Sequence, residues 1–236
     1  MPLAPVLPLL HKLLKPSFPT CLWEGDSQER AIALTFDDGP HPDHTPRLLA
    51  VLDRYQVPVS FFWLGVCVNR FPAVARSIYE RGHWLGLHGY THQSFPRLTA
   101  TALQQSLRDT QKAIAQACQL DLVIVQQQVR DVRPPNGLFT PQTLKLLQQW
   151  QYRPVMWSVV PEDWVRPGVQ CVVQRVVQQT RPGSVIVLHD GYCGGEDVAA
   201  IAAQIIPTLL GQGYQFVTID QLWQQHPIAR YRTGER

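Results

Sequence analysis

Two histidines four residues apart, His88 and His92, form the sequence pattern with the clearest chemical meaning. Imidazoles at this spacing fall on one side of a helical turn, close enough to bind one ion. Two neutral imidazole nitrogens and one carboxylate make a three-ligand site that leaves a fourth position open for water. The same spacing also occurs without a metal, so the interpretation depends on finding a carboxylate nearby.

Two adjacent carboxylates, Asp37 and Asp38, are candidates for the third ligand, and they come at the end of a predicted strand. If the strand continues through both residues, their side chains point to opposite sides and have different surroundings. One carboxylate could then bind a metal while the other remains free as a base. The alternative is that one caps a helix after Gly39 and Pro40, and the other is solvated.

Three further polar residues stand near the ends of predicted strands. Arg133 precedes two prolines, which forbid a helix there, and its guanidinium could clamp a carboxylate or lie at the surface. His189 follows the apolar run 185–188, either at the mouth of a buried strand or as a satisfied core histidine. Asp163 could accept a hydrogen bond from that imidazole and raise its pKa by favouring the charged form.

The elements that must position these residues follow from the hydrophobic pattern. Apolar or β-branched runs predict seven strands, at 32–36, 59–64, 84–88, 129–133, 155–160, 185–189 and 215–219. Helical spacing and end signals predict helices at 45–55, 72–80, 99–118, 141–150, 169–179 and 198–210. Strands that alternate with helices imply parallel pairing, because a parallel crossover needs an intervening segment.

Seven such units in roughly 190 residues favour one small closed barrel, with an open doubly wound sheet as the alternative that periodicity cannot exclude. Five of the seven predicted strands end in polar or ionisable residues. The carboxyl ends of parallel strands share one face in either architecture, and chemistry gathers at that face. We therefore expect the aspartates, histidines and Arg133 to converge, although they lie far apart in the sequence.

Composition excludes several classes of protein. The chain has 236 residues, 21 Lys and Arg against 18 Asp and Glu, and a hydrophobic fraction of 45%, which is not the composition of a disordered chain. The positive charges are scattered and form no basic block, so nucleic acid is not the expected partner. Five widely spaced cysteines without a Cys-x-x-Cys pair predict neither a disulfide framework nor a cysteine zinc site.

The apolar N-terminal segment 1–10 contains three prolines, and its lysines follow the apolar run instead of preceding it as in a signal peptide. We expect a disordered or packed arm, with a weak membrane-surface anchor as the alternative. No stretch approaches the ~20 apolar residues of a transmembrane helix. The localisation therefore stays unknown, as a soluble or a peripherally membrane-attached protein.

Taken in their order along the chain, these motifs resemble the polysaccharide deacetylase family, the NodB-homology domain of carbohydrate esterase family 4. The resemblance covers about residues 31–223 and rests on five segments: 35–40 (Thr-Phe-Asp-Asp-Gly-Pro), 88–92, 133–137, 163–164 and 188–189. It implies an α/β fold, a distorted (β/α)7 TIM-like barrel. We accordingly expect an N-terminal arm at 1–30, the catalytic domain at 31–225 and a C-terminal tail at 226–236.

The resemblance also implies a role for each matching residue. Asp37 is similar to the catalytic base and His189 to the general acid, with Arg133 holding Asp37 and Asp163 tuning His189. The ligands of a divalent ion, usually Zn²⁺ and otherwise an ion such as Co²⁺, would be Asp38, His88 and His92. The substrate would contact Pro135, Asn136, Trp164 and Leu188, with the main-chain N–H of Asn136 helping to hold the oxyanion.

The expected activity is metal-dependent hydrolysis of the acetamide of N-acetylglucosamine-type residues in a polysaccharide or oligosaccharide such as peptidoglycan or chitin. The partner would be an acetylated glycan. Two positions depart from the family pattern: Gly89 replaces a usual Ser or Thr, and Asn136 replaces a usual aromatic residue. These departures leave open a related hydrolase of O-acetyl xylan or of a small amide, and a non-catalytic glycan-binding protein on the same fold.

Overall fold

The computed structural model describes residues 13–26 and 28–225. Its strands are all parallel and run in the order β5-β4-β3-β2-β1-β6, and β7 pairs with the first two residues of β1. The strand bounds are β1 Ala31–Asp37, β2 Ser60–Trp63, β3 Trp84–Leu87, β4 Asp131–Val132, β5 Arg153–Pro154, β6 Val185–His189 and β7 Gln215–Phe216. Neighbouring strands follow one another in sequence from β1 to β5, which is the order of a barrel and differs from a doubly wound sheet.

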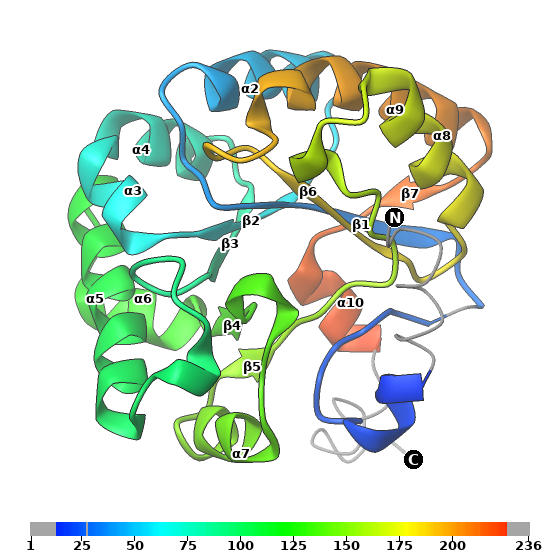
Figure 1. Ribbon diagram of the computed structural model, residues 1–236. Coiled ribbons are helices and arrows are strands. Elements are labelled where there is room, and N and C mark those ends of the chain that lie inside the picture. The colour runs from blue at the N-terminus through cyan, green and yellow to red at the C-terminus, as the bar shows by residue number, and fades with distance from the viewer. Residues whose placement is uncertain (1–12, 27, 226–236) are drawn as a thin grey trace.

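Helices surround these strands, with α2, α8 and α9 along one side, α3 to α6 along another and α7 beside β5 (Figure 1). Their bounds are α2 His44–Tyr55, α3 Gly65–Arg70, α4 Pro72–Glu80, α5 Ala100–Cys118, α6 Leu122–Gln128, α7 Pro141–Gln149, α8 Val169–Gln179, α9 Val198–Gly211 and α10 Ile219–Gln225. Their ends follow local signals: Thr99, Asp121 and Thr140 accept backbone N–H bonds at the starts of α5, α6 and α7. The six predicted helices are confirmed to within one residue at each end, whereas α3, α6 and α10 were not predicted.

The barrel closes irregularly between β5 and β6, where the predicted strand 155–160 is wrong. The strand is Arg153–Pro154, and beyond it the chain forms only isolated bridges, Val155 with Leu22 and Val159 with Ile186. The cause is a change of partner, because Met156 donates its N–H to Leu22 while Val159 donates its N–H to Val185 of β6. This discontinuity is the distortion of the barrel.

The bridge to Leu22 also places part of the predicted N-terminal arm. Cys21, Leu22 and Trp23 are buried, and Trp23 packs with Leu144 of α7 and Met156. The described part of the arm therefore packs against the barrel. The expectations for residues 1–10 and for the tail 226–236 lie outside the described residues.

Helix α10 covers the end of the barrel at which the strands begin. Ile219 donates its N–H to the hydroxyl of Ser60, the first residue of β2, and Trp223 donates its indole N–H to Asp131, the first residue of β4. At the opposite end, where the strands finish, the connecting loops surround the barrel. That is the end at which the sequence predicts the functional residues.

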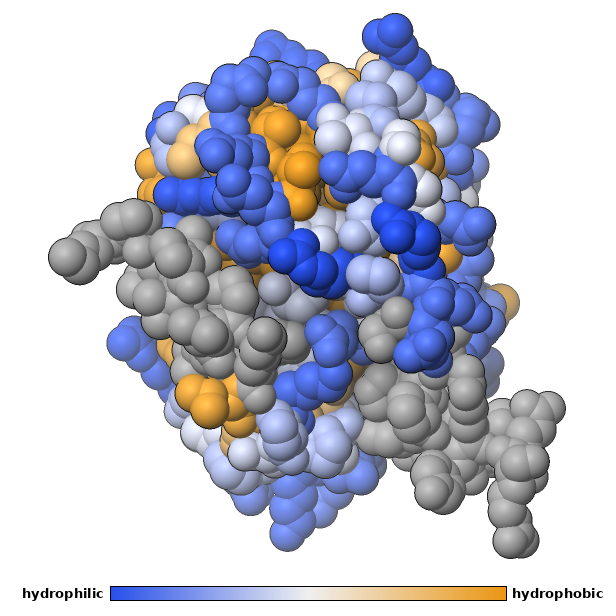
Figure 2. Space-filling model, turned by 90° about the vertical axis from the view of Figure 1, so that its right-hand side faces the viewer, coloured by the Kyte–Doolittle hydropathy of each residue, from blue (hydrophilic) through white to orange (hydrophobic). Residues whose placement is uncertain are grey.

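The outer surface is mixed in character. On the side of the molecule at the right of Figure 1, hydrophobic residues occur in groups interspersed with hydrophilic ones (Figure 2). Within residues 13–26 and 28–225, no helix combines the length and hydrophobicity that crossing a bilayer would require.

Candidate active site

The carboxyl ends of the strands surround a pocket of about 660 Å³. The pocket is lined by Asp37, Asp38, Leu64, Cys67, His88, His92, Pro134, Asn136, Gly137, Trp157, Val160, Trp164, Val187, His189, Tyr192 and Cys193. These residues come from the ends of the six strands β1 to β6 and from the segments that follow them. The predicted convergence of the polar residues at this face is confirmed.

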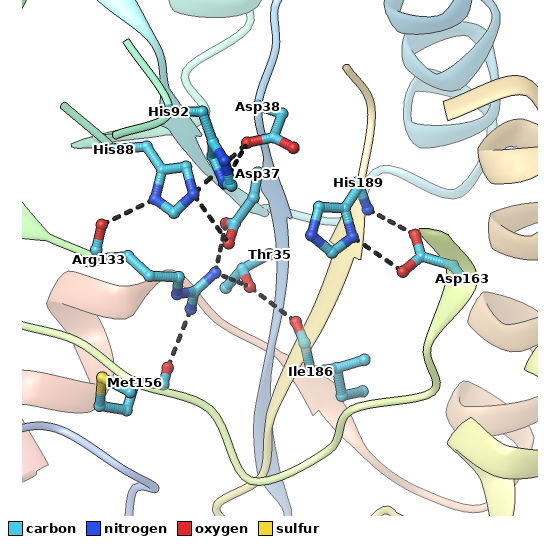
Figure 3. Close-up of polar contacts among 10 residues, drawn as sticks. All are labelled: Thr35, Asp37, Asp38, His88, His92, Arg133, Met156, Asp163, Ile186 and His189. Atoms are coloured by element: carbon cyan, nitrogen blue, oxygen red, sulfur yellow. Dashed lines mark hydrogen bonds and ion pairs between the residues drawn. The ribbon is translucent and has the colours of Figure 1, made fainter. Parts of the chain in front are cut away.

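A cluster of three possible metal-binding side chains lies in the pocket wall. One ligand atom each from Asp38, His88 and His92 lie within 4.8 Å of one another. The Nε2 atoms of both histidines are 3.5 Å from Oδ1 of Asp38 (Figure 3). That oxygen is buried and has no hydrogen-bond partner among the described residues. A buried carboxylate oxygen without a donor is costly, so the three side chains fit a cation at this point.

The loop that carries the two histidines is not a helical turn, which corrects the expectation from their spacing. Residues 88–92 form an irregular loop after β3, and Gly89 has φ of +86°. A side chain at position 89 would be strained at this φ, and its Cβ would lie 3.1 Å from the carbonyl oxygen of Thr91. The imidazoles therefore converge because the chain turns sharply at a glycine.

A hydroxyl from another element steadies this loop. The N–H of Tyr90 donates to Oγ of Ser106 on α5 over 2.8 Å. The same Oγ lies 3.5 Å from where a Cβ of residue 89 would stand. Ser106 therefore supplies a hydroxyl beside the loop, whereas the family pattern has a Ser or Thr at the position of Gly89.

His88 is held in the protonation state that suits a metal ligand. Its Nδ1 is 2.7 Å from the carbonyl oxygen of Arg133, so Nδ1 carries the proton and Nε2 presents a lone pair to Asp38. Burial lowers the pKa of His88, against the raising effect of Asp37 and Asp38. The neutral imidazole is thus favoured.

Asp37 forms an ion pair with the fully buried Arg133. Nη1 of Arg133 donates to Oδ1 of Asp37 over 2.6 Å and to Oγ1 of Thr35 over 2.7 Å, and Nη2 donates to the carbonyl oxygen of Met156 over 3.0 Å. The guanidinium also lies 4.0 Å from the centre of the Phe62 ring. Both ionic groups are therefore fixed by hydrogen bonds, which a buried ion pair needs to offset desolvation.

Asp37 and Asp38 both line the pocket because the strand ends between them. Asp37 is the last residue of β1, and Asp38 has φ of +71°. The alternating geometry expected for a continuing strand does not apply, although the two carboxylates still have different partners. Helix α2 begins after Asp43, so neither member of the pair is its cap.

His189 and Asp163 form the second ionic pair, across the pocket from the histidine cluster (Figure 3). Asp163 accepts the main-chain N–H of His189 over 2.7 Å and faces its Nδ1 over 2.8 Å. Burial by itself lowers the pKa of His189, but the Asp163 carboxylate outweighs it, and the pKa rises to about 10. The imidazole is therefore held in its protonated form at neutral pH.

Of the four predicted substrate-binding residues, two line the pocket and two do not. Asn136 and Trp164 line the pocket, and the Trp164 ring meets the His189 ring edge to face. Leu188 and Pro135 are buried and do not line it. In strand β6 side chains alternate, so Val187 and His189 share the pocket face while Leu188 points into the core.

Several residues of the site carried no signal in the sequence analysis. Ser94 accepts a hydrogen bond from the side-chain amide of Asn136 over 3.0 Å. Cys67, Tyr192 and Cys193 line the pocket from segments that have no recognisable pattern. Only the register of neighbouring strands and loops brings them there.

Comparison with known proteins agrees with this geometry. The chain is 33% identical over 216 residues to a peptidoglycan-N-acetylglucosamine deacetylase of Bacillus cereus, covering 91% of this chain and 97% of that protein. It is 34% identical over 207 residues to a chitooligosaccharide deacetylase of a Bradyrhizobium species, covering 83% of this chain and 92% of the other.

The same similarity holds for a solved structure and for the family as a whole. A crystal structure of a peptidoglycan N-acetylglucosamine deacetylase superimposes with a TM-score of 0.82 at 26% identity, covering 90% of this chain and 96% of that one. Residues 24–155 match the sequence model described as polysaccharide deacetylase. With its strand-end motifs, its barrel and these relatives in agreement, the chain belongs to the polysaccharide deacetylase family.

Proposed function

We propose that this protein is a metal-dependent N-deacetylase that hydrolyses the acetamide of N-acetylglucosamine-type residues in a glycan and releases acetate. The observation that supports it best is the placement of two different buried ionic pairs on one pocket. Asp37 with Arg133 provides a carboxylate positioned by a guanidinium group, and His189 with Asp163 provides an imidazole held as a cation. An amide hydrolase needs one group of each kind.

Asp38, His88 and His92 would hold the divalent ion, Zn²⁺ or an ion such as Co²⁺. Carboxylate and imidazole donors suit both ions, and three protein ligands leave a position open. When bound, the ion would polarise the acetyl carbonyl and acidify a water molecule.

Asp37 is the proposed general base. Its carboxylate would take a proton from the attacking water, a contribution that is typically about 10²–10⁴-fold in rate. Arg133 is a positioning residue, because it touches Asp37 and not the pocket, and its three hydrogen bonds fix the direction of the carboxylate. The geometry is thus set before substrate binds.

His189 is the proposed general acid. Its Nδ1–H is hydrogen-bonded to Asp163. The proton on Nε2 would therefore be the one transferred to the amide nitrogen as the carbon–nitrogen bond breaks. The electron pair of that bond stays on nitrogen, and the products are acetate and a free amine. The main-chain N–H of Asn136 would donate to the oxyanion, and loss of such a donor typically costs about 2.7–4 kcal/mol.

The substrate class follows from the relatives and from the pocket walls. The relatives named above act on N-acetylglucosamine of peptidoglycan and on chitooligosaccharides, as their names state. Trp157, Trp164 and Tyr192 offer aromatic faces of the kind that sugars stack on. The side chain of Asn136 is bonded to Ser94 at one edge of the pocket, where the family more often has an aromatic residue, so a smaller acylated substrate is the second candidate.

The deciding experiment measures acetate and product masses after incubation of the Zn²⁺-loaded protein with chitin oligomers, peptidoglycan fragments, O-acetyl xylan and small amides. We expect acetate release from the first two, and its loss in Asp37→Asn and His189→Ala with metal content retained. Asp109→Asn, which changes a partly exposed carboxylate that does not line the pocket, is the control. Turnover of only xylan or of small amides would select the second candidate, and glycan binding without acetate release would identify a non-catalytic protein.

The metal ligands are tested separately. We expect His88→Ala to lose most bound metal in equilibrium dialysis with Zn²⁺ and Co²⁺, because it removes the most buried of the three donors. Stoichiometric metal in that variant would remove His88 from the ligand set. The ion that gives the higher turnover at equal occupancy identifies the preferred metal.

A further inference from the structure

A second pocket, of about 210 Å³, lies at the end of the barrel opposite the active site. It is lined by Arg108, Gln111, Gln126, Arg130, Trp150, Gln151 and Tyr152. Arg130 and Tyr152 stand directly before β4 and β5, so the pocket is at the edge where the strands begin. It shares no residue with the active-site pocket.

The charge of this pocket is positive and uncompensated. Two guanidinium groups line it and no carboxylate does. The acidic neighbours are engaged elsewhere, since Asp109 pairs with Lys112 and Asp131 pairs with Arg153. Within the described residues, neither Arg108 nor Arg130 forms an ion pair.

Arg130 also has an unsatisfied donor. Its Nε is buried and has no hydrogen-bond partner among the described residues. A buried N–H without an acceptor is costly, and convergence of two like charges adds to the cost. An oxyanion between the two arginines would remove both costs.

The Gln111 and Tyr152 side chains of the pocket are hydrogen-bonded and neutral. Tyr152 donates its hydroxyl to Oε1 of Gln111 over 3.1 Å, and Nε2 of Gln111 donates to the carbonyl oxygen of Val129 over 2.9 Å. Burial raises the pKa of Tyr152 to about 12, against the lowering effect of the Arg108 charge. The phenol therefore contributes no negative charge.

We infer that this pocket binds a phosphate group, held between the guanidinium groups of Arg108 and Arg130. Arginine pairs recognise tetrahedral oxyanions through paired N–H donors, and a doubly charged ligand matches two guanidinium groups. The side-chain amides of Gln126 and Gln151 supply further donors at the mouth. The ligand is either the free ion or a phosphomonoester, because both present the same terminal oxygens.

The test is calorimetric titration of the full-length, metal-free protein with inorganic phosphate, with acetate and with glycerol 3-phosphate. We expect phosphate to bind, and Arg130→Gln and Arg108→Gln each to weaken it about tenfold or more, the effect of losing a charged hydrogen-bond donor. Arg108 is exposed, so its substitution leaves folding intact. Arg47→Gln, on the exposed face of α2, is the matched control and should bind phosphate as the unsubstituted protein does.

Phosphate binding that survives both substitutions lies elsewhere and overturns the inference, as does equal or tighter binding of acetate. Glycerol 3-phosphate that binds as tightly as inorganic phosphate supports an esterified ligand, and its exclusion supports the free ion. Deacetylase activity does not enter this test, so the result is independent of the proposed function.

Discussion

The pKa values of His88 and His189 depend on the group to which each imidazole is hydrogen-bonded. His88 is buried and His189 is largely buried, yet their pKa values move in opposite directions. His88 bonds to a neutral carbonyl, so desolvation dominates, whereas His189 bonds to the carboxylate of Asp163 and is held as a cation. In the proposed mechanism, His88 would therefore act as a lone-pair donor to the metal and His189 as an acid.

This contrast predicts the pH dependence of Asp163→Asn. A general acid is active in its protonated form, and in the unsubstituted protein that form persists up to a pKa of about 10. Without the Asp163 charge, burial lowers the pKa of His189, so activity should fall at a lower pH on the alkaline side. The pH profile of kcat/KM checks this, since it reports the free enzyme.

Asp109→Asn serves as the control for that profile, because its carboxylate does not line the pocket and pairs with Lys112 at the surface. An alkaline limb at the same pH in Asp163→Asn and in the control would remove Asp163 as the group that sets the pKa of His189.

At the scale of elements, the strand-end loops hold the site by packing directly against one another. The loop after β6 crosses the loop after β1, where Gly191 meets Asp38. A Cβ at position 191 would lie 2.5 Å from Cβ of Asp38 and 2.8 Å from its main chain. Only glycine allows this approach, so the position of a proposed metal ligand depends on a residue from another loop.

Gly191→Ala should therefore weaken metal binding about 10–100-fold, the usual effect of disturbing the surroundings of a ligand. Gly211→Ala is the matched control, because a Cβ there has no neighbour within 4 Å. Equilibrium dialysis with Zn²⁺ on both variants provides the measurement. Equal affinities would show that the loop after β1 relaxes to accept the methyl group.

At the scale of the whole molecule, the two ends of the barrel differ in structure. The end where strands finish carries the pocket, whereas the end where they begin carries a buried polar network around Asp131. That carboxylate accepts hydrogen bonds from Trp84, Trp223 and Arg153 and so ties α10 to β3, β4 and β5. Arg153 also pairs with Asp220 of α10 at 2.9 Å.

Asp131→Ala should lower the free energy of unfolding by about 3–5 kcal/mol, because it removes the buried carboxylate that accepts hydrogen bonds from Arg153, Trp84 and Trp223. Denaturant titration measures this, with Asp109→Asn as the surface control, for which we expect about 0–1 kcal/mol. Activity per folded molecule should stay unchanged, since the network is at the opposite end from the pocket. A loss of activity larger than the loss of folded protein would contradict this separation.

The amino-acid sequence by itself determined the alternation of strands and helices, the ends of six helices and the ionisable residues of the pocket. These features are local: periodicity, capping residues and proline act over a few residues, and the carboxyl ends of parallel strands must share a face. That is why Asp37, His88, Arg133 and His189 could be placed together in advance.

Only the tertiary structure decided how those residues meet. The strand 155–160 was mispredicted because Leu22, more than 130 residues away, takes the place of a sheet partner for Val155. The histidine loop is shaped by Gly89 in a left-handed conformation and by the hydroxyl of Ser106 on α5. Arg133 donates a hydrogen bond to Thr35, which is 98 residues away in the sequence. Hydrogen bonds between distant segments follow from strand register and loop packing, and these become defined only when the whole barrel closes.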